Sequence, residues 1–490
     1  MQVKQAAEIE IELEKPQAEP YHSKLIIGNL NFFGKSFSSK IKFDRCIIKG
    51  DINFSNCIFK EDLIFDETNF EGNVLFENVI FEKPSKFSSC KFGLFSLAYI
   101  NERIPINQQK KIEIRQSCFK DEVNFSSEFY SRVSFKQVKF EKIASFHGAI
   151  FSLYASFIRC TFMEGSVFMF SKFEGNTFFN KINFWDKVDF EEATFGKDMG
   201  FEYSLDEDRF SRNRMVKNFD FSNSIFNGET SFWKAKFYGN SNFKNTKFLD
   251  ICNFLGAKFI GNVNFHGAEF KYFAKFGAGS KIFGNTDFSE VVFHKGAYLH
   301  DLEFGMKLKL ARAQFENLML EWSSIRDHLE DNWQSNEEFI RLEEVFDKSI
   351  IPLYLSLIKN FNGLGLNEDA DECYLMLREK KKKNIKDKKG QIIDFFDYAL
   401  FGYGVKWQNP LYIGLIIMIL FSLLFLIFDN HFRINNYEAL TNATINSVAS
   451  FISSPISDNK YIIIISYAER FLGYIIMSCF LITLAKKRLR

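Results

Sequence analysis

Charge of one sign, proline and paired cysteines are all scarce in this 490-residue chain. Proline occurs only 7 times, which does not fit a disordered or collagen-like protein. Lys and Arg together number 62 and Asp and Glu 61, so the net charge is +1. A chain without an overall basic field lacks the usual means of attracting nucleic acid. We therefore expect no nucleic-acid partner.

The residue patterns of common catalytic and metal sites are also missing. None of the eight cysteines belongs to a CxxC pair or to a Cys/His cluster with zinc-ligand spacing. The seven histidines are scattered without HExxH spacing, and there is no Walker A phosphate loop. We expect no disulfide, no metal, no cofactor and no enzymatic activity.

Residues 1–23 lack a basic start followed by an apolar run, which is the pattern of a secretory signal peptide. Their acidic composition predicts a short acidic tail instead. The bulk of the N-terminal half is expected to stay in the cytosol.

Phenylalanine, by contrast, is abundant and regularly spaced, with 63 occurrences. From Phe54 to Phe92 it recurs in alternating steps of five and six residues, which gives a period of eleven. Neither a helix nor a strand produces this spacing, whereas a coiled chain with one apolar anchor on each short side does. The pattern predicts a solenoid. Its interior ladder is expected to include Phe54, Phe59, Phe65, Phe70, Phe243, Phe248, Phe254 and Phe259.

A small side chain stands two residues before many of these anchors, often directly after Gly, Asn or Ser. Residues two apart in a strand share a face, so the small residue should point inward like the anchor. The residue before it suits a tight corner. Free cysteine packs as a small hydrophobe, so cysteines at inward positions are expected to fill the core. They are Cys46, Cys57, Cys90, Cys160 and Cys252.

The motifs FLGAKF, FHGAEF and FKNTKF are similar to those of the pentapeptide-repeat family. The resemblance implies an all-β fold, a right-handed quadrilateral β-helix over residues 24–320, with Phe or Leu stacked along its axis. The six-residue steps predict coils of about 22 residues, about a dozen in number, with a bulge on alternate sides. Residues 93–118 and 202–220 interrupt the ladder. They are expected to be surface insertions, or loops that bind a protein partner.

Some members of that family imitate DNA with an acidic rod and occupy nucleic-acid enzymes. Residues 21–320 contain 40 Lys and Arg against 35 Asp and Glu, so this solenoid has the opposite sign. An inhibitor of this type is therefore the least favoured interpretation.

Helical spacing replaces the phenylalanine ladder after Phe315. Residues 321–390 are expected to form a helical linker that ends in a dense basic cluster. Residues 391–407 are expected to form an amphipathic segment at the membrane surface. The tripeptide Gly402–Tyr403–Gly404, although typical of potassium-channel filters, precedes the apolar runs and is expected to end that segment.

Residues 408–490 are expected to form a two-span module, because 411–428 and 461–485 are long apolar runs. Basic residues flank the pair, whereas the loop 429–460 is nearly neutral. The positive-inside rule then predicts cytoplasmic termini and an outside loop. We expect a multi-pass protein of the inner (cytoplasmic) membrane, with lipid as a partner and a cytosolic solenoid.

The loop between the two runs resembles the pore loop of two-transmembrane potassium channels. The stretch SVASFISSPISD is similar to the pore helix and filter, and AERFLGYIIMSC is similar to the inner helix of bacterial members. The resemblance implies a homo-oligomer, a tetramer for a pore. It assigns the pore loop to Ser447, Ser450, Phe451, Ser453, Ser454, Pro455, Ser457 and Asp458, and the inner helix to Glu469, Arg470 and Gly473.

Pro455 and Ser457 stand where the pattern has its two filter glycines. Proline cannot adopt the backbone conformations that a carbonyl filter needs, so potassium selectivity is not expected. The pore would be non-selective and lined by serine hydroxyls, or it would not conduct. Glu469 and Arg470 are either an intramembrane pair or residues at the outer interface.

Two functions remain after this reasoning. One is a channel-like membrane protein whose cytosolic solenoid biases a pore. The other is a membrane-anchored interaction scaffold in which the two spans only tether the solenoid and have no transport activity.

Overall fold

The chain forms a β-solenoid and a separate C-terminal helical unit. The computed structural model describes residues 1–15, 19–93, 110–203, 218–329, 350–428, 437–452 and 460–488. The solenoid unit includes the start of helix α5 (Ile351–Gly363), through Ser356, and the helical unit continues from Leu357.

One coil illustrates how the repeat folds. Strands β8 (Ile52–Asn53), β9 (Ile58–Phe59), β10 (Leu63–Asp66) and β11 (Asn69–Phe70) follow one another around the coil. Each pairs in parallel with the strand one coil further on, as β10 does through Leu63 and Ser85, 22 residues apart.

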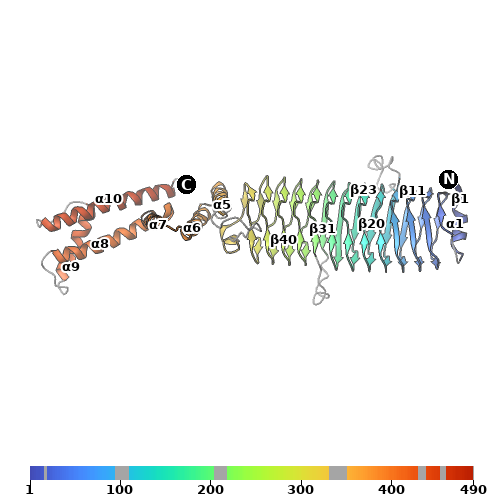
Figure 1. Cartoon of the computed structure of the whole chain (residues 1–490), viewed down its shortest axis with the longest axis horizontal. Coiled ribbons are helices and arrows are strands. Elements are labelled where there is room, and N and C mark those ends of the chain that lie inside the picture. The colour runs from blue at the N-terminus through green and yellow to red at the C-terminus, as the bar shows by residue number, and fades with distance from the viewer. Residues whose placement is uncertain are drawn as a thin grey trace. The chain divides into compact units, whose positions relative to one another are not determined.

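Stacked coils produce four parallel ladders (Figure 1). Among the described residues, two ladders contain 14 and 13 strands. The other two are joined by the long strand β28 (Thr177–Phe184), whose two halves pair with different strands of the preceding coil. The expected all-β solenoid with 22-residue coils is thus confirmed, and it has about 13 turns.

Phenylalanine rings fill the interior in stacks along the solenoid. The rings of Phe54 and Phe76 lie 4.9 Å apart between centroids, and those of Phe248 and Phe270 lie 4.8 Å apart. All eight ladder residues named from the sequence lie in the interior, with at most 2% of their surface exposed. Stacked aromatic rings of this kind contribute to stability beyond the area that they bury.

Alternate corners of the coil differ in backbone conformation. One residue with positive φ recurs every eleven residues, as at Arg45, Asn56, Glu67 and Asn78. These corners lie within the five-residue steps, where fewer residues turn the chain. The expected bulges on alternate sides are not found, because the one register shift among the described strands lies in β28, beyond Asn180. Corner conformation, rather than bulging, accommodates the two step lengths.

The N-terminal residues are folded and do not form the expected acidic tail. Strand β1 (Gln2–Gln5) pairs in parallel with β3 (Lys24–Ile27), and helix α1 (Ala6–Leu13) buries Ile9 and Leu13. The acidic residues bond to the chain around them. Glu12 accepts hydrogen bonds from Lys4 at 2.7 Å and from the Tyr21 hydroxyl at 2.8 Å. Apolar residues four apart among the acids therefore make a cap.

Both expected interruptions are shorter than the phenylalanine spacing suggested. Strand β16 (Lys111–Arg115) already belongs to the ladder, because Ile114 pairs opposite Phe76 of β12 (Val74–Glu77). Strand β31 (Met199–Tyr203) likewise continues the solenoid beyond Phe201. Isoleucine had replaced phenylalanine as the anchor at the first site, so the Phe pattern alone placed the boundary too late. Residues 94–109 and 204–217 lie outside the described ranges.

After the last strand, β50 (Leu318–Met319), the described chain is helical. Helix α3 (Trp322–Ile325) and the start of α5 complete the solenoid unit. The helical unit continues through α6 (Asn367–Lys383), α7 (Lys388–Phe401), the 3-10 turn η4 (Gly402–Gly404), α8 (Asn409–Phe428), α9 (Tyr437–Ile452) and α10 (Lys460–Arg488).

Helices α8 and α10 are long and apolar enough to span a membrane. Their mean hydropathies are 3.0 over Asn409–Phe428 and 1.5 over Lys460–Ala485. The segment expected at 391–407 is instead a helix that begins at Lys388, and Gly402 ends it in the left-handed conformation. The expected outside loop 429–460 contains helix α9, with the residues on either side of it outside the described ranges.

Candidate functional site

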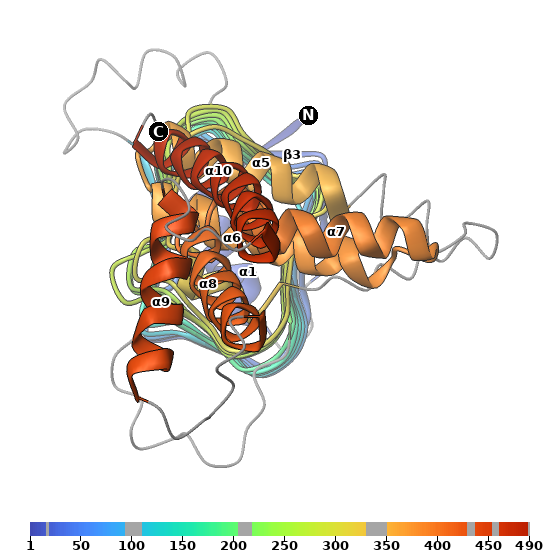
Figure 2. The same cartoon turned by 90° about the vertical axis from the view of Figure 1, so that its left-hand side faces the viewer.

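Helices α8, α9 and α10 pack side by side, and small polar residues of α9 meet the other two helices (Figure 2). The Thr444 hydroxyl lies 3.3 Å from that of Ser422 on α8. The Ser450 hydroxyl donates to the Ser466 hydroxyl on α10 at 3.0 Å. Hydroxyl contacts between helices are typical of packing in an apolar environment, where small side chains allow close approach.

Glu469 is the one acid buried between these helices in the described part of the unit. Its Oε1 lies 2.5 Å from Ser447 Oγ, which is also 2.8 Å from the backbone carbonyl oxygen of Met418. Glu469 Oε2 has no hydrogen-bond partner among the described residues. A serine hydroxyl has a single proton, so it donates to only one of its two neighbours. Both contacts are hydrogen bonds at once when the carboxyl group carries a proton and donates to Ser447.

Phe451 packs between two glycines on either side of α9. A Cβ atom built on Gly414 of α8 would lie 3.4 Å from the Phe451 ring. One built on Gly473 of α10 would lie 2.6 Å from the Phe451 carbonyl oxygen, closer than real Cβ atoms approach. Gly473 therefore permits α10 to approach the C-terminal end of α9.

The structure brings together some of the residues assigned from the channel resemblance. Ser447, Ser450 and Phe451 of α9 meet Glu469, Ser466 and Gly473 of α10. The remaining pore-loop candidates lie outside the described residues, so the resemblance of that segment to a filter stays a prediction. They are Ser453, Ser454, Pro455, Ser457 and Asp458.

Arg470 does not join Glu469. Its guanidinium lies over the Tyr467 ring, 5.4 Å from the centroid, and the described residues contain no ion pair between Arg470 and Glu469. Sequence reasoning missed Ser422, Thr444 and Ser466. The signal available was the recurrence of hydroxyl residues at steps of three in α9.

A second polar cluster fixes α7 to α6. The Arg378 guanidinium contacts Asp394 at 3.2 Å and Asp397 at 2.6 Å. The Tyr403 hydroxyl donates to Asp394 at 2.8 Å, and Arg378 lies 4.3 Å from the centre of the Tyr403 ring. Burial and the neighbouring Asp394 carboxylate raise the pKa of Tyr403 to about 12. The tyrosine of the Gly-Tyr-Gly tripeptide is thus part of a helix-to-helix contact and not of a filter.

The repeat of the solenoid matches a known family model. The model is described as pentapeptide repeats (nine copies), and it matches residues 32–80, 43–91 and 221–269. The solenoid is built of pentapeptide repeats. No curated protein and no solved structure matches the chain.

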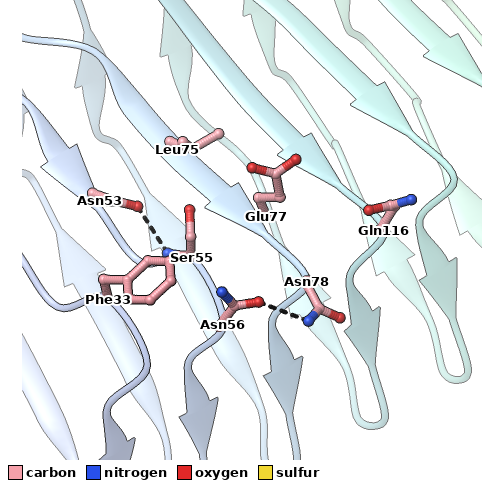
Figure 3. Close-up of a pocket in the computed structure, with 8 residues that line it drawn as sticks. All are labelled: Phe33, Asn53, Ser55, Asn56, Leu75, Glu77, Asn78 and Gln116. Carbon is pink, nitrogen blue, oxygen red and sulfur yellow. Dashed lines mark hydrogen bonds between the residues drawn. The ribbon is translucent and has the colours of Figure 1, made fainter.

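The surface of the pentapeptide-repeat solenoid carries rows of asparagine. The Asn78 side chain donates to that of Asn56 at 2.7 Å, one coil away. Figure 3 shows this pair in a hollow with Phe33 and Glu77. Within the described ranges, no three His, Cys, Asp or Glu side chains gather where they could hold a metal ion. The hollow offers hydrogen-bonding groups and an exposed aromatic ring.

Cysteine thiols of the pentapeptide-repeat solenoid lie in its core. Burial raises the pKa of Cys57 to about 11 and that of Cys90 and Cys160 to about 12. A thiol with a raised pKa is a poor nucleophile and a poor metal ligand at neutral pH. These residues therefore fill space, as their inward positions in the repeat suggest.

Proposed function

We propose that the chain is a membrane-anchored pentapeptide-repeat protein whose helices α8, α9 and α10 form an ion-channel-like pore module when several copies assemble. The exposure of α8 carries the membrane part of this proposal. Only 17% of its most apolar window is buried, and Leu415, Ile416 and Ile419 are each more than half exposed. A large apolar surface is unfavourable in water, whereas the hydrocarbon core of a bilayer accommodates it.

The order of the three helices supports the pore part. Helix α9 has 16 residues. At 1.5 Å per residue it is about 24 Å long, shorter than the ~30 Å hydrocarbon core. It also packs against both long helices. A short helix held between two spanning helices, followed by a brief connection, is the plan of a re-entrant pore helix and filter.

The distribution of charge supports a cytoplasmic solenoid. Lysines at the end of α6 and the start of α7 precede α8, and Lys486, Lys487 and Arg488 follow the second apolar run. Basic residues on the outer ends of a pair of spans favour the cytoplasm. Both termini and the pentapeptide repeats would then lie on that side of the inner membrane.

Potassium selectivity is not part of the proposal, because Pro455 and Ser457 replace the filter glycines. We propose a pore without selectivity between monovalent cations, formed by a homo-oligomer. A tetramer is the expected assembly, since this module surrounds a central axis in the channels that it resembles.

Ion flux from liposomes that contain the purified full-length chain tests the pore. We expect cation flux from the wild type and a changed flux from the double variant Pro455→Gly and Ser457→Gly. The variant Asn435→Gly and Asn436→Gly, on the other side of α9, is the matched control and should behave as wild type. Absence of flux from every variant, together with a cross-linked stoichiometry other than four, would reject the pore.

A membrane-anchored interaction scaffold is the second candidate function. It is favoured by the asparagine-rich surface of the solenoid, which offers hydrogen bonds to a protein partner (Figure 3). Replacing α8 to α10 by an unrelated two-span anchor separates the two candidates. Full activity of that chimaera in cells supports the scaffold, whereas loss of activity with normal membrane insertion supports the pore.

A further inference from the structure

Helix α7 has an exposed face that is apolar along its length and basic at its N-terminal end. Ile392, Phe395 and Phe396 have 57%, 60% and 54% of their surfaces exposed. Together with Lys388 and Gln391 they line a shallow hollow. Exposed lysines are also present beside it, at Lys389 and at the end of α6. Aromatic and aliphatic groups therefore lie next to ammonium groups on one surface.

The opposite face of α7 is occupied by a fixed polar contact. Asp394 is buried and is held by Arg378 and by the Tyr403 hydroxyl. Asp397 also pairs with Arg378. These are the two acids within α7, and both turn towards α6. The exposed apolar face consequently lacks carboxylates that would repel an anionic ligand.

The same helix is attached to one end of the apolar helices. Asn409, at the start of α8, donates to the Tyr398 carbonyl at 2.8 Å. Trp407 lies 6.1 Å from the Phe480 ring in the C-terminal part of α10. If α8 and α10 span the membrane as proposed above, this end lies at the level of the lipid head groups. Tryptophan and lysine are enriched at that level.

We propose that the exposed face of α7, with the lysines of the α6–α7 turn, binds anionic phospholipids of the leaflet from which α8 enters the bilayer. The lysine ammonium groups attract the phosphates, and the apolar side chains insert below the head groups. This proposal rests on the membrane anchorage of the proposed function but not on ion conduction. The surface selects lipid by charge, which a simple two-span anchor does not need to do.

Hydrogen–deuterium exchange of the full-length chain in nanodiscs tests the proposal. Discs of phosphatidylcholine alone are compared with discs that also contain phosphatidylglycerol. We expect the amides of α7 to exchange about fivefold more slowly in the anionic discs, the scale of one lysine contact with an anionic surface. The amides of α8 and α10 should be equally protected in both.

Two variants separate charge recognition from general effects. Neutralising the turn by Lys382→Gln, Lys383→Gln, Lys388→Gln and Lys389→Gln should abolish the difference between the two discs. The matched control neutralises four exposed lysines of the solenoid by Lys234→Gln, Lys244→Gln, Lys258→Gln and Lys295→Gln, and it should keep the difference.

Three results would overturn the proposal. Equal exchange of α7 in both discs would show that lipid charge is not recognised. Slow exchange already in detergent would show that another copy of the chain or another protein covers the face. Free exchange of α8 and α10 in both discs would reject the membrane anchorage itself, so failure of the anchorage is distinguished from failure of lipid recognition.

Discussion

The small residues inside the solenoid do more than fill space. Cys57 lies with its Sγ 2.9 Å from the Phe32 carbonyl oxygen, and Thr246 donates to the Phe221 carbonyl at 2.7 Å. Ser224 makes the same kind of bond to Phe190 at 2.6 Å. Each bond joins one coil to the coil before it and satisfies a buried polar atom. Sequence spacing predicted the size of these residues, but bonding to a neighbouring coil depends on stacking, which no local pattern contains.

Replacing one interior anchor tests the ladder at the residue scale. Phe254 is fully buried between Phe232 and Phe276, with ring centroids 4.8 and 4.9 Å away. Phe254→Ala should cost about 3–5 kcal/mol, because it removes a buried ring and leaves a cavity. Thermal unfolding of the purified chain, followed by circular dichroism, measures the loss.

The control for this experiment is Phe283→Ala, since Phe283 has 50% of its surface exposed. Its unfolding temperature should stay close to that of the wild type. An equal fall for both variants would contradict the view that interior stacking holds the coils together.

At the scale of elements, the contact of α9 with α8 and α10 determines the shape of the helical unit. Two glycines, Gly414 and Gly473, leave the space that Phe451 occupies. Three hydroxyl contacts, at Thr444, Ser447 and Ser450, follow one another along the same helix. The sequence indicated the two long helices through their length and hydropathy. The pairing of particular residues across helices required the three-dimensional structure.

Gly473→Ala tests this packing. The new Cβ would lie 2.6 Å from the Phe451 carbonyl oxygen, which is backbone and cannot move aside cheaply. We expect a loss of about 1–3 kcal/mol, the usual cost of overpacking, seen as a lower unfolding temperature in detergent.

Gly363→Ala is the matched control, because a Cβ at this position in α5 meets nothing within 4 Å. It should leave stability unchanged or raise it slightly, since alanine favours helix more than glycine does. Equal behaviour of the two variants would mean that α9 and α10 do not pack closely in solution.

The whole solenoid is closed at both ends by helical segments of its own unit. Helix α1 covers the first coil, and Trp322 of α3 packs against Tyr354 of α5 beyond the last coil. Unpaired strand edges invite pairing with other chains, and repeat proteins commonly protect their ends with a polar cap. The capped ends therefore favour a solenoid that does not join end to end with other copies.

Ile9→Asp tests the N-terminal cap. Ile9 is fully buried, so a charge there should detach α1 and expose the edge of the first coil. Size-exclusion chromatography should then show larger assemblies. Ile11→Asp is the control, since Ile11 has 65% of its surface exposed, and it should elute as wild type. An unchanged profile for both would indicate that the cap does not prevent association.

Much of this whole was predictable because the repeat makes the same statement many times. The five-and-six spacing predicted the coil, the inward residues and the core cysteines. It failed where the pattern is carried by one residue only, as at Ile114, or by acids around a pair of apolar residues, as at Ile9. The helical unit has no repeat to average over, so its glycine contacts and the Arg378 cluster were not foreseen.

The constant offset of 22 residues between paired strands also has an evolutionary consequence. Duplicating or deleting one coil would keep every later residue on its own face and would change the solenoid by one strand spacing, about 4.8 Å. Insertions of any other length would rotate all that follows. A gene of this kind can therefore adjust reach in small, uniform increments while preserving which side chains meet a partner.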